Sequence, residues 1–150
     1  PNNTKFKSII SCLFFYAFIL YINFLKNVIL VIEPRVFTKR TVGVEAPAGY
    51  VEDGEKPIEA AKRELIEETG LKAKELIQLR EYYCDMGSFA GLTSSFIAKD
   101  CEKVSEQKLD SDEFIAIVEC TIDEAKELID MEYIKDINTI YLIENLETFI

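Results

Sequence analysis

The sequence predicts an α+β domain, with α/β as the alternative class, in which a sheet lies between helices. Two observations favour this class. Apolar runs rich in β-branched and aromatic residues mingle with segments of helical periodicity, and no internal repeat or low-complexity tract interrupts them. The chain has 150 residues, of which 49% are hydrophobic, and this is enough for one substantial core. We therefore expect a single domain over residues 1–150.

Two apolar runs near the N-terminus predict strands at residues 13–22 and 27–33, joined as a buried hairpin near the sequence NFLKN. Residues 8–25 are nearly free of charge and about as long as a membrane-spanning helix, so a membrane anchor is the alternative. The second β-branched run favours the hairpin, because a sheet covered on both faces has continuous apolar strands. We therefore expect no association with a membrane.

The segment 33–56 is predicted to be a loop that leads into a helix from Pro57 to Thr69. Pro57 suits the first helical turn, and Gly70 suits the position just past the last one. Three strands and two helices are expected after it: strands near 74–84, 93–99 and 113–120, a helix from the Thr121 and Glu124 capping-box pattern to about Ile129, and a helix around 137–146.

The composition narrows the possible chemistry. The net charge of -10 argues against a general nucleic-acid binder, which needs a basic surface. The chain contains no histidine, so Ser-His triads, histidine-ligated zinc and imidazole acid-base catalysis are excluded. The four cysteines show no C-x-x-C spacing, which favours reduced thiols in a cytoplasmic protein. Any catalysis must therefore use carboxylates, Lys, Tyr, Cys or a metal ion.

Three glutamates, Glu64, Glu67 and Glu68, lie on one face of the predicted helix, because residues three and four positions apart are neighbours there. Their like charges repel, and the opposite apolar face would hold them in a fixed direction. A hard cation such as Mg²⁺ or Mn²⁺ would make such a cluster favourable, since it prefers oxygen ligands. A solvated acidic face with local salt bridges is the alternative for a helix taken alone.

The residues around this helix follow the pattern G-x5-E-x7-R-E-U-x-E-E-x-G-U, where U is a bulky aliphatic residue. Its nine fixed positions are filled by Gly49, Glu55, Arg63, Glu64, Leu65, Glu67, Glu68, Gly70 and Leu71. This pattern resembles the Nudix box, the signature of hydrolases that act on nucleoside diphosphates linked to another moiety. The resemblance implies the Nudix fold, a mixed sheet sandwiched between helices. It also implies that Glu64 and Glu68 are metal ligands, that Glu67 is a further ligand or a base, and that Glu55 and Arg63 orient the acidic face. Gly49 and Gly70 would serve backbone geometry.

The flanks of the box are similar to those of ADP-ribose pyrophosphatases. The sequence EAPAG, residues 45–49, resembles the E-L-P-A-G of that group, which implies that the carbonyl of Ala48 joins the metal shell. The same resemblance makes Arg35 the candidate for a substrate contact. Glu113 falls where the group has a carboxylate that reaches the metals or activates water, and a plain polar residue at the start of a strand is the alternative.

Two departures from that group leave its substrate open. Met86 stands where the group commonly has a proline, and ungapped placement puts Gly91 where a loop glutamate is expected. Only about twelve residues precede the first core strand, whereas the group has an N-terminal segment that swaps across a dimer. Either dimerisation differs here or that segment lies before Pro1, so a homodimer remains an open expectation.

The resemblance implies metal-dependent hydrolysis of a pyrophosphate bond, with ADP-ribose converted to AMP and ribose 5-phosphate. Glu113 or Glu67 would activate the water, and Glu64 and Glu68 would hold Mg²⁺ or Mn²⁺. The alternatives are hydrolysis of another nucleoside diphosphate sugar or of an oxidised nucleotide, and a catalytically silent module that senses ADP-ribose. We expect a small nucleoside diphosphate substrate as the partner. We do not expect binding to nucleic acid.

Overall fold

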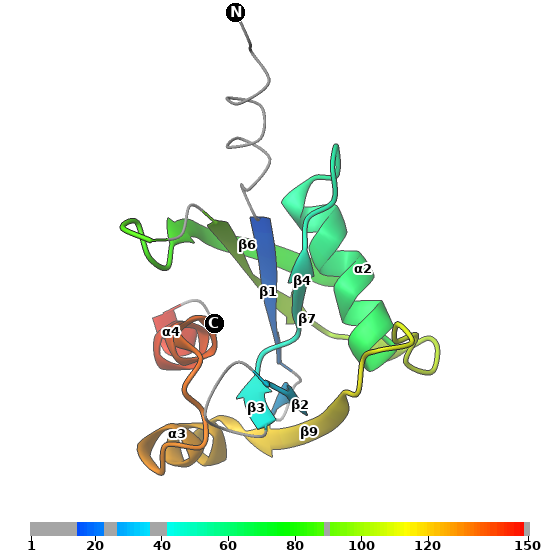
Figure 1. Ribbon diagram of the computed structural model, residues 1–150. Coiled ribbons are helices and arrows are strands. Elements are labelled where there is room, and N and C mark those ends of the chain that lie inside the picture. Colours follow the sequence, from blue (N-terminus) through cyan, green and yellow to red (C-terminus); the bar gives the residue numbers. More distant parts are fainter. Residues whose placement is uncertain (1–14, 23–26, 37–41, 89–90, 149–150) are drawn as a thin grey trace, which may run out of the picture.

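The computed structural model describes residues 15–22, 27–36, 42–88 and 91–148, and of residues 15–22 only the backbone (Figure 1). Its main feature is a mixed seven-stranded sheet with the strand order β3-β2-β1-β7-β6, in which β4 also pairs with β1 and β9 with β2. The strands are β1 (Phe15–Ile22), β2 (Asn27–Pro34), β3 (Val42–Glu45), β4 (Ala48–Tyr50), β6 (Glu75–Tyr83), β7 (Leu92–Lys99) and β9 (Ala116–Thr121). Strands β1 and β7 run parallel, and the other pairs of this sheet are antiparallel.

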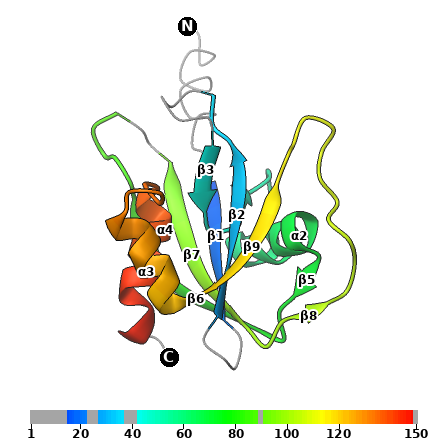
Figure 2. The same cartoon turned by 90° about the horizontal axis from the view of Figure 1, so that it is seen from below.

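Helices cover both faces of the sheet, as the view from below shows (Figure 2). They are α2 (Pro57–Thr69), α3 (Ile122–Asp130) and α4 (Ile137–Asn145), followed by the short 3-10 helix η1 (Leu146–Thr148). On one face, Leu65 of α2 packs with Phe96 of β7. On the other, Leu30 of β2 packs with Leu142 and Ile143 of α4. The prediction of an α+β domain with a sheet between helices is thus confirmed.

The helix that carries the box is confirmed at both predicted ends. Pro57 occupies its first turn, and Gly70 follows it in the left-handed conformation, with φ of 70°. The N–H of Gly70 donates to the carbonyl of Ile66 and closes the last turn at 2.8 Å. The capping box at the start of α3 is also present, because the Thr121 hydroxyl accepts from Glu124 N and the Glu124 carboxylate accepts from Thr121 N.

The predicted loop 33–56 was partly wrong, because it contains β3 and β4. Both strands are short and lie on either side of Pro47, so their alternation is too brief to be recognised from the sequence. The two-stranded sheet of β5 (Leu71–Lys72) and β8 (Glu102–Lys103) was missed for the same reason. Strand β9 begins at Ala116 rather than at residue 113, because Glu113 belongs to a turn in which its N–H donates to the Asp110 carbonyl at 3.1 Å.

The N-terminal runs form neighbouring antiparallel strands rather than one helix. Tyr21 of β1 pairs with Ile29 of β2, and Ile22 pairs with Val28. Residues 8–14 of the alternative membrane anchor and residues 23–26 of the predicted hairpin connection lie outside the described residues. Within the described ranges, every helix is too short or too polar to cross a bilayer.

The two left-handed glycines provide a matched test of how tightly the end of α2 packs. A Cβ on Gly70 would collide with the Ser105 carbonyl, whereas a Cβ on Gly54, with φ of 86°, would meet no atom within 4 Å. We expect Gly54→Ala to lower the free energy of unfolding by about 1 kcal/mol, from backbone strain alone. Gly70→Ala should lower it clearly further. Urea unfolding of both variants measures the difference, and equal losses would contradict the close contact.

Candidate active site

The helix α2 holds the three box glutamates in a fixed direction. Its Ala60, Ala61 and Leu65 are fully buried and pack against Phe96 and Ala98 of β7. This anchoring leaves the helix no freedom to turn its acidic face away, because rotation would expose the apolar face to water. The sequence thus fixes the carboxylates at one end of the sheet despite their mutual repulsion.

Arg63 gathers the carboxylates of the box around one guanidinium group. It binds Glu55 through two parallel hydrogen bonds, Nε to Oε1 at 3.1 Å and Nη2 to Oε2 at 3.0 Å. Its Nη1 also donates to Glu64 Oε1 at 2.6 Å and to Glu67 Oε2 at 3.0 Å. A further bond from Nη2 reaches the Tyr50 carbonyl at 2.9 Å and ties the helix to β4. This one side chain therefore sets the positions of three acids, and the hydrogen bond to Glu55 is the main reason its own pKa is raised.

Glu68 is the buried member of the cluster, with only 5% of its surface exposed. Its Oε2 accepts a hydrogen bond from the Ala48 N–H at 3.1 Å, which places the segment before the box against the helix. Burial raises the pKa of Glu68 to about 8, and the charges of Glu64, Glu33 and Glu113 add to the rise. A carboxyl group this costly to ionise marks the location where a cation would be most stabilising.

Gly49 is required because the Glu64 carboxylate lies directly against its backbone. A Cβ on this residue would collide with all three atoms of that carboxylate. Gly49 therefore serves close approach and not a left-handed turn, unlike Gly70. The pKa of Glu64 is raised by burial, and the charges of Glu67 and Glu113 raise it further, although Arg63 opposes the shift.

The loop before β9 brings Glu113 to the same cluster. Gln107 Nε2 donates to the Glu68 carbonyl at 2.7 Å and to the Ile115 carbonyl at 3.1 Å, and Lys108 N donates to the Glu67 carbonyl at 2.8 Å. These bonds fasten the loop to the end of α2. The charge of Glu113 consequently contributes to the raised pKa of Glu64 and of Glu68. Sequence reasoning missed Gln107, whose role depends on two carbonyls that only the fold brings together.

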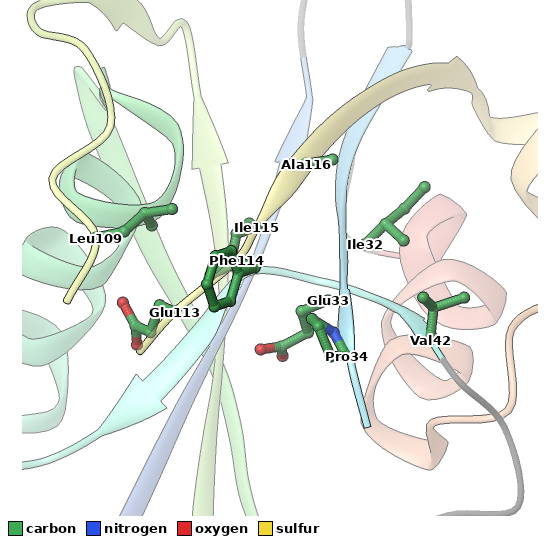
Figure 3. Close-up of a pocket in the computed structure, with 9 residues that line it drawn as sticks. All are labelled: Ile32, Glu33, Pro34, Val42, Leu109, Glu113, Phe114, Ile115 and Ala116. Atoms are coloured by element: carbon green, nitrogen blue, oxygen red, sulfur yellow. The ribbon is translucent and has the colours of Figure 1, made fainter. Parts of the chain in front are cut away.

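Glu33 is a further acid that sequence reasoning did not single out. It lies on β2, and burial raises its pKa, with the charges of Glu45 and Glu113 adding to the rise. Glu33 and Glu113 both line one pocket and come from different segments of the chain (Figure 3). An acidic residue at the end of an otherwise apolar strand was the available signal.

Arg35, predicted to contact substrate, lies among carboxylates in this structure. It binds Glu45 through Nε to Oε1 at 2.8 Å and Nη2 to Oε2 at 2.5 Å, and it also forms an ion pair with Glu33. The hydrogen bond to Glu45 is the main reason its pKa is raised. Gly43 makes room for this arrangement, since a Cβ there would meet both Glu45 and Arg35. Arg35 therefore lies beside the acidic cluster, held by two acids.

The donor set suits a hard divalent cation, because it consists of carboxylate oxygens around a buried acid. In the described part of the chain, however, no three acidic or thiol side chains converge closely enough to hold a metal ion as they stand. Glu64 and Glu67 each direct one oxygen to Arg63 instead. The residues therefore fit such an ion in chemistry and location, and the two acids would have to exchange Arg63 for it.

The positions that depart from the pyrophosphatase pattern lie away from these contacts. Met86 is 85% exposed in the connection between β6 and β7. Gly91 is buried immediately before β7 and provides no acid. Of the two sequence candidates for the water-activating base, Glu67 belongs to the acidic cluster and Glu113 lies near it, since the charges of both act on Glu64.

Comparisons with known proteins agree on the family. The model of the NUDIX domain matches residues 16–140. An ADP-ribose pyrophosphatase of Bacillus subtilis is 36% identical over 122 residues, which are 81% of this chain and 65% of that protein. A methanol dehydrogenase activator of Bacillus methanolicus is 35% identical over 105 residues, which are 69% of this chain and 57% of that protein. This chain thus spans less than two thirds of the length of either relative.

Two further likenesses cover more of the related chain. A GDP-mannose pyrophosphatase of Cronobacter sakazakii is 31% identical over 138 residues, which are 87% of this chain and 72% of that protein. The crystal structure of an ADP compounds hydrolase matches with a TM-score of 0.76 at 21% identity and covers 89% of this chain and 72% of that one. The latter likeness confirms the fold expected from the box.

Gly49 and Gly87 provide a matched pair for testing the contact with Glu64. A Cβ on Gly87 would meet only Asp85 Oδ1, at 3.3 Å on the exposed surface. We expect Gly49→Ala to displace the Glu64 carboxylate and weaken Mn²⁺ binding by about tenfold or more, a loss of about 1.4 kcal/mol. Gly87→Ala should leave it unchanged. Titration calorimetry with Mn²⁺ measures both, and an unaltered affinity in Gly49→Ala would remove Glu64 from the metal site.

Glu68 should make the stability of the metal-free protein fall as the pH rises. Its pKa is about 8 in the folded state against 4.5 for the ordinary group, so between these values the unfolded chain releases a proton that the folded chain retains. Glu68 lowers the free energy of unfolding least below pH 4.5, where it is protonated in both the folded and the unfolded chain. Between pH 4.5 and about pH 8 the free energy of unfolding falls by about 1.4 kcal/mol per pH unit because of this group.

Urea unfolding in EDTA from pH 5 to pH 8 measures this slope. Glu68→Gln does not ionise, so it should lack this loss of stability with rising pH and become the more stable protein at pH 8. Glu59→Gln is the control, because Glu59 is exposed on the same helix and pairs with Lys62. Parallel slopes for the wild type and Glu68→Gln would show that Glu68 titrates normally.

Proposed function

The chain belongs to the NUDIX domain family, and on that premise we propose that it hydrolyses the pyrophosphate bond of a nucleoside diphosphate derivative. ADP-ribose is the proposed substrate, and AMP and ribose 5-phosphate are the products. The observation that supports this most directly is the buried carboxyl of Glu68, held by the Ala48 N–H at the centre of an acidic cluster. Mere binding of a ligand would not require such a cluster, which destabilises the fold on its own.

Hydrolases of this family generally use a divalent metal ion, and we propose Mg²⁺ or Mn²⁺ here. Glu64, Glu68, Glu67 and the carbonyl of Ala48 would hold it. When bound, such an ion neutralises the diphosphate and stabilises the charge that develops at phosphorus. It would also offset the burial and the mutual repulsion of the carboxylates, since burial first and neighbouring acids second raise the pKa of Glu64 and of Glu68.

The side chains of this protein supply the remaining steps. Glu113 or Glu67 accepts a proton from water as the water oxygen bonds to one phosphorus, and the bridging P–O bond then breaks to leave two monophosphates. Gln107 keeps the loop of Glu113 against α2. Arg35 lies beside the cluster and would bind a phosphate or ribose oxygen by exchanging part of its contact with Glu33 or Glu45.

A second candidate substrate is another nucleoside diphosphate sugar. The likeness to GDP-mannose pyrophosphatases favours it, because the match covers 87% of this chain and 72% of that protein. The exposed Met86 in place of a proline is consistent with either substrate. The chemistry at phosphorus would be the same, and the two substrates would differ in the base and the sugar that they present.

Two broader expectations accompany this proposal. We propose that residues 1–150 form one domain of this family and that the protein works in the cytoplasm. Cys84, Cys101 and Cys120 are free thiols, which is consistent with a reducing compartment.

A substrate panel tests the proposal. We expect the full chain with Mg²⁺ to convert ADP-ribose to AMP and ribose 5-phosphate, and EDTA to abolish turnover. Glu68→Gln should lower kcat by roughly 100-fold or more, because it removes a charged ligand, while the circular dichroism spectrum stays native. Glu59→Gln should retain the wild-type rate.

The panel also contains GDP-mannose, other nucleoside diphosphate sugars and oxidised nucleotides, with products identified by mass spectrometry. Preferred cleavage of one of these would reassign the substrate within the same chemistry. Binding of ADP-ribose without turnover of any compound would contradict hydrolysis and support a sensor.

A further inference from the structure

A pocket of about 440 Å³ lies between the end of β2 and the segment that leads into β9 (Figure 3). It forms where two paired strands separate. The pairing of β2 with β9 ends at Ile32 and Ala116, while β2 continues to Pro34, which pairs with Val42 of β3. The chain before Ala116 therefore diverges from β2 and borders an open hollow beside the end of β2. Its volume lies within the range of about 300–1,000 Å³ that is typical of small-molecule sites.

The lining of the pocket combines apolar side chains with two carboxylates. The residues are Ile32, Glu33, Pro34, Val42, Leu109, Glu113, Phe114, Ile115 and Ala116. Glu33 and Glu113 provide oxygen atoms only, and ionised carboxylates accept hydrogen bonds without donating any. No cationic side chain is among the described residues that line it. Glu33 is already ion-paired with Arg35, and Glu113 Oε2 already accepts from the Asp110 N–H at 2.9 Å, but each carboxylate has further acceptor capacity. The lining itself therefore suits a neutral group that donates hydrogen bonds better than a phosphate group.

The pocket adjoins the proposed site of hydrolysis through the segment that carries Glu113. Gln107 Nε2 donates to the carbonyl of Ile115, which lines the pocket, and to the carbonyl of Glu68 at the end of α2. The charges of Glu33 and Glu113, which also line the pocket, add to the rise in the pKa of Glu68 that burial causes. A group that enters the pocket would thus be attached to a phosphate held at the end of α2.

Phe114 provides an aromatic surface for such a group. The residue is 72% exposed although it lies among the apolar residues of the lining, so the fold gains little from it. An exposed ring beside two acceptor groups suits a sugar, which presents an apolar C–H face to the ring and hydroxyl donors to the acids. Adenine suits it less well, because it has a single amino donor group among several ring-nitrogen acceptors, whereas a sugar offers several hydroxyl donors to the two carboxylates.

We propose that this pocket binds the terminal sugar of a nucleoside diphosphate sugar, with Phe114 packed on the sugar ring and Glu33 and Glu113 accepting from its hydroxyl groups. The inference rests on the proposed function, because it concerns the group released with the second phosphate. It makes Phe114 a specificity-determining residue, which neither the box nor its flanks indicate.

The test compares the two products as separate ligands. Titration calorimetry with Mg²⁺ measures the binding of ribose 5-phosphate, which contains the terminal sugar, and of AMP, which contains the base. Phe114→Ala should weaken the binding of ribose 5-phosphate by about tenfold and leave that of AMP within about twofold. Phe114→Tyr should restore the affinity because it keeps the ring. Met131→Ala is the control, because Met131 is 62% exposed at the end of α3, away from the pocket.

Each outcome decides the proposal. Loss of AMP binding in Phe114→Ala would assign the pocket to the base and overturn it, as would unchanged binding of both products. A wild-type protein that binds neither product nor ADP-ribose would overturn it as well. The proposed function fails separately: a wild type that binds ribose 5-phosphate through Phe114 but cleaves no compound of the panel keeps the pocket and loses the reaction. Circular dichroism of each variant checks that the fold is intact.

Discussion

Repulsion among carboxylates at one end of α2 is the constraint around which this structure is arranged. Burial of Ala60, Ala61 and Leu65 fixes the helix on the sheet, so the acids cannot disperse into solvent. Glu68 is buried with them and raised in pKa to about 8. Arg63 offsets part of the repulsion by binding Glu55, Glu64 and Glu67 together. The remaining cost is what a divalent cation would relieve, so the stability and the chemistry of the site depend on the same charges.

The fold supplies this cluster from segments that are far apart in the sequence (Figures 1 and 2). Strand β2 contributes Glu33, the first residue of β4 contributes the Ala48 N–H, and the loop before β9 contributes Glu113. Short tethers hold these segments in place. The Ala46 N–H donates to Thr139 Oγ1 of α4 at 2.8 Å, and Gln107 binds the carbonyl of Glu68. The two helical layers therefore act on the site from opposite faces of the sheet.

The sequence predicted best the helices whose ends are marked by capping residues. Both ends of helix α2 were predicted correctly because Pro57 and Gly70 mark its first turn and its end. Helix α3 was predicted from its capping box. Strands β3 and β4 were missed, since they have four and three residues and are stabilised by pairing with β2 and β1. The face shared by Glu64, Glu67 and Glu68 follows from helical spacing. The approach of Glu33, Glu113 and Gln107 to that face depends on long-range pairing, which spacing does not encode. The metal ligands and the catalytic base remain predictions.

The most direct measurement is a crystal structure of the protein soaked in Mn²⁺, with anomalous diffraction recorded near the manganese edge. The account predicts a peak at the end of α2, coordinated by oxygens of Glu64 and Glu68 and by the carbonyl of Ala48, with the Glu64 oxygen withdrawn from Arg63. A map without a peak there, in which Glu64 and Glu67 still bind Arg63, would contradict it.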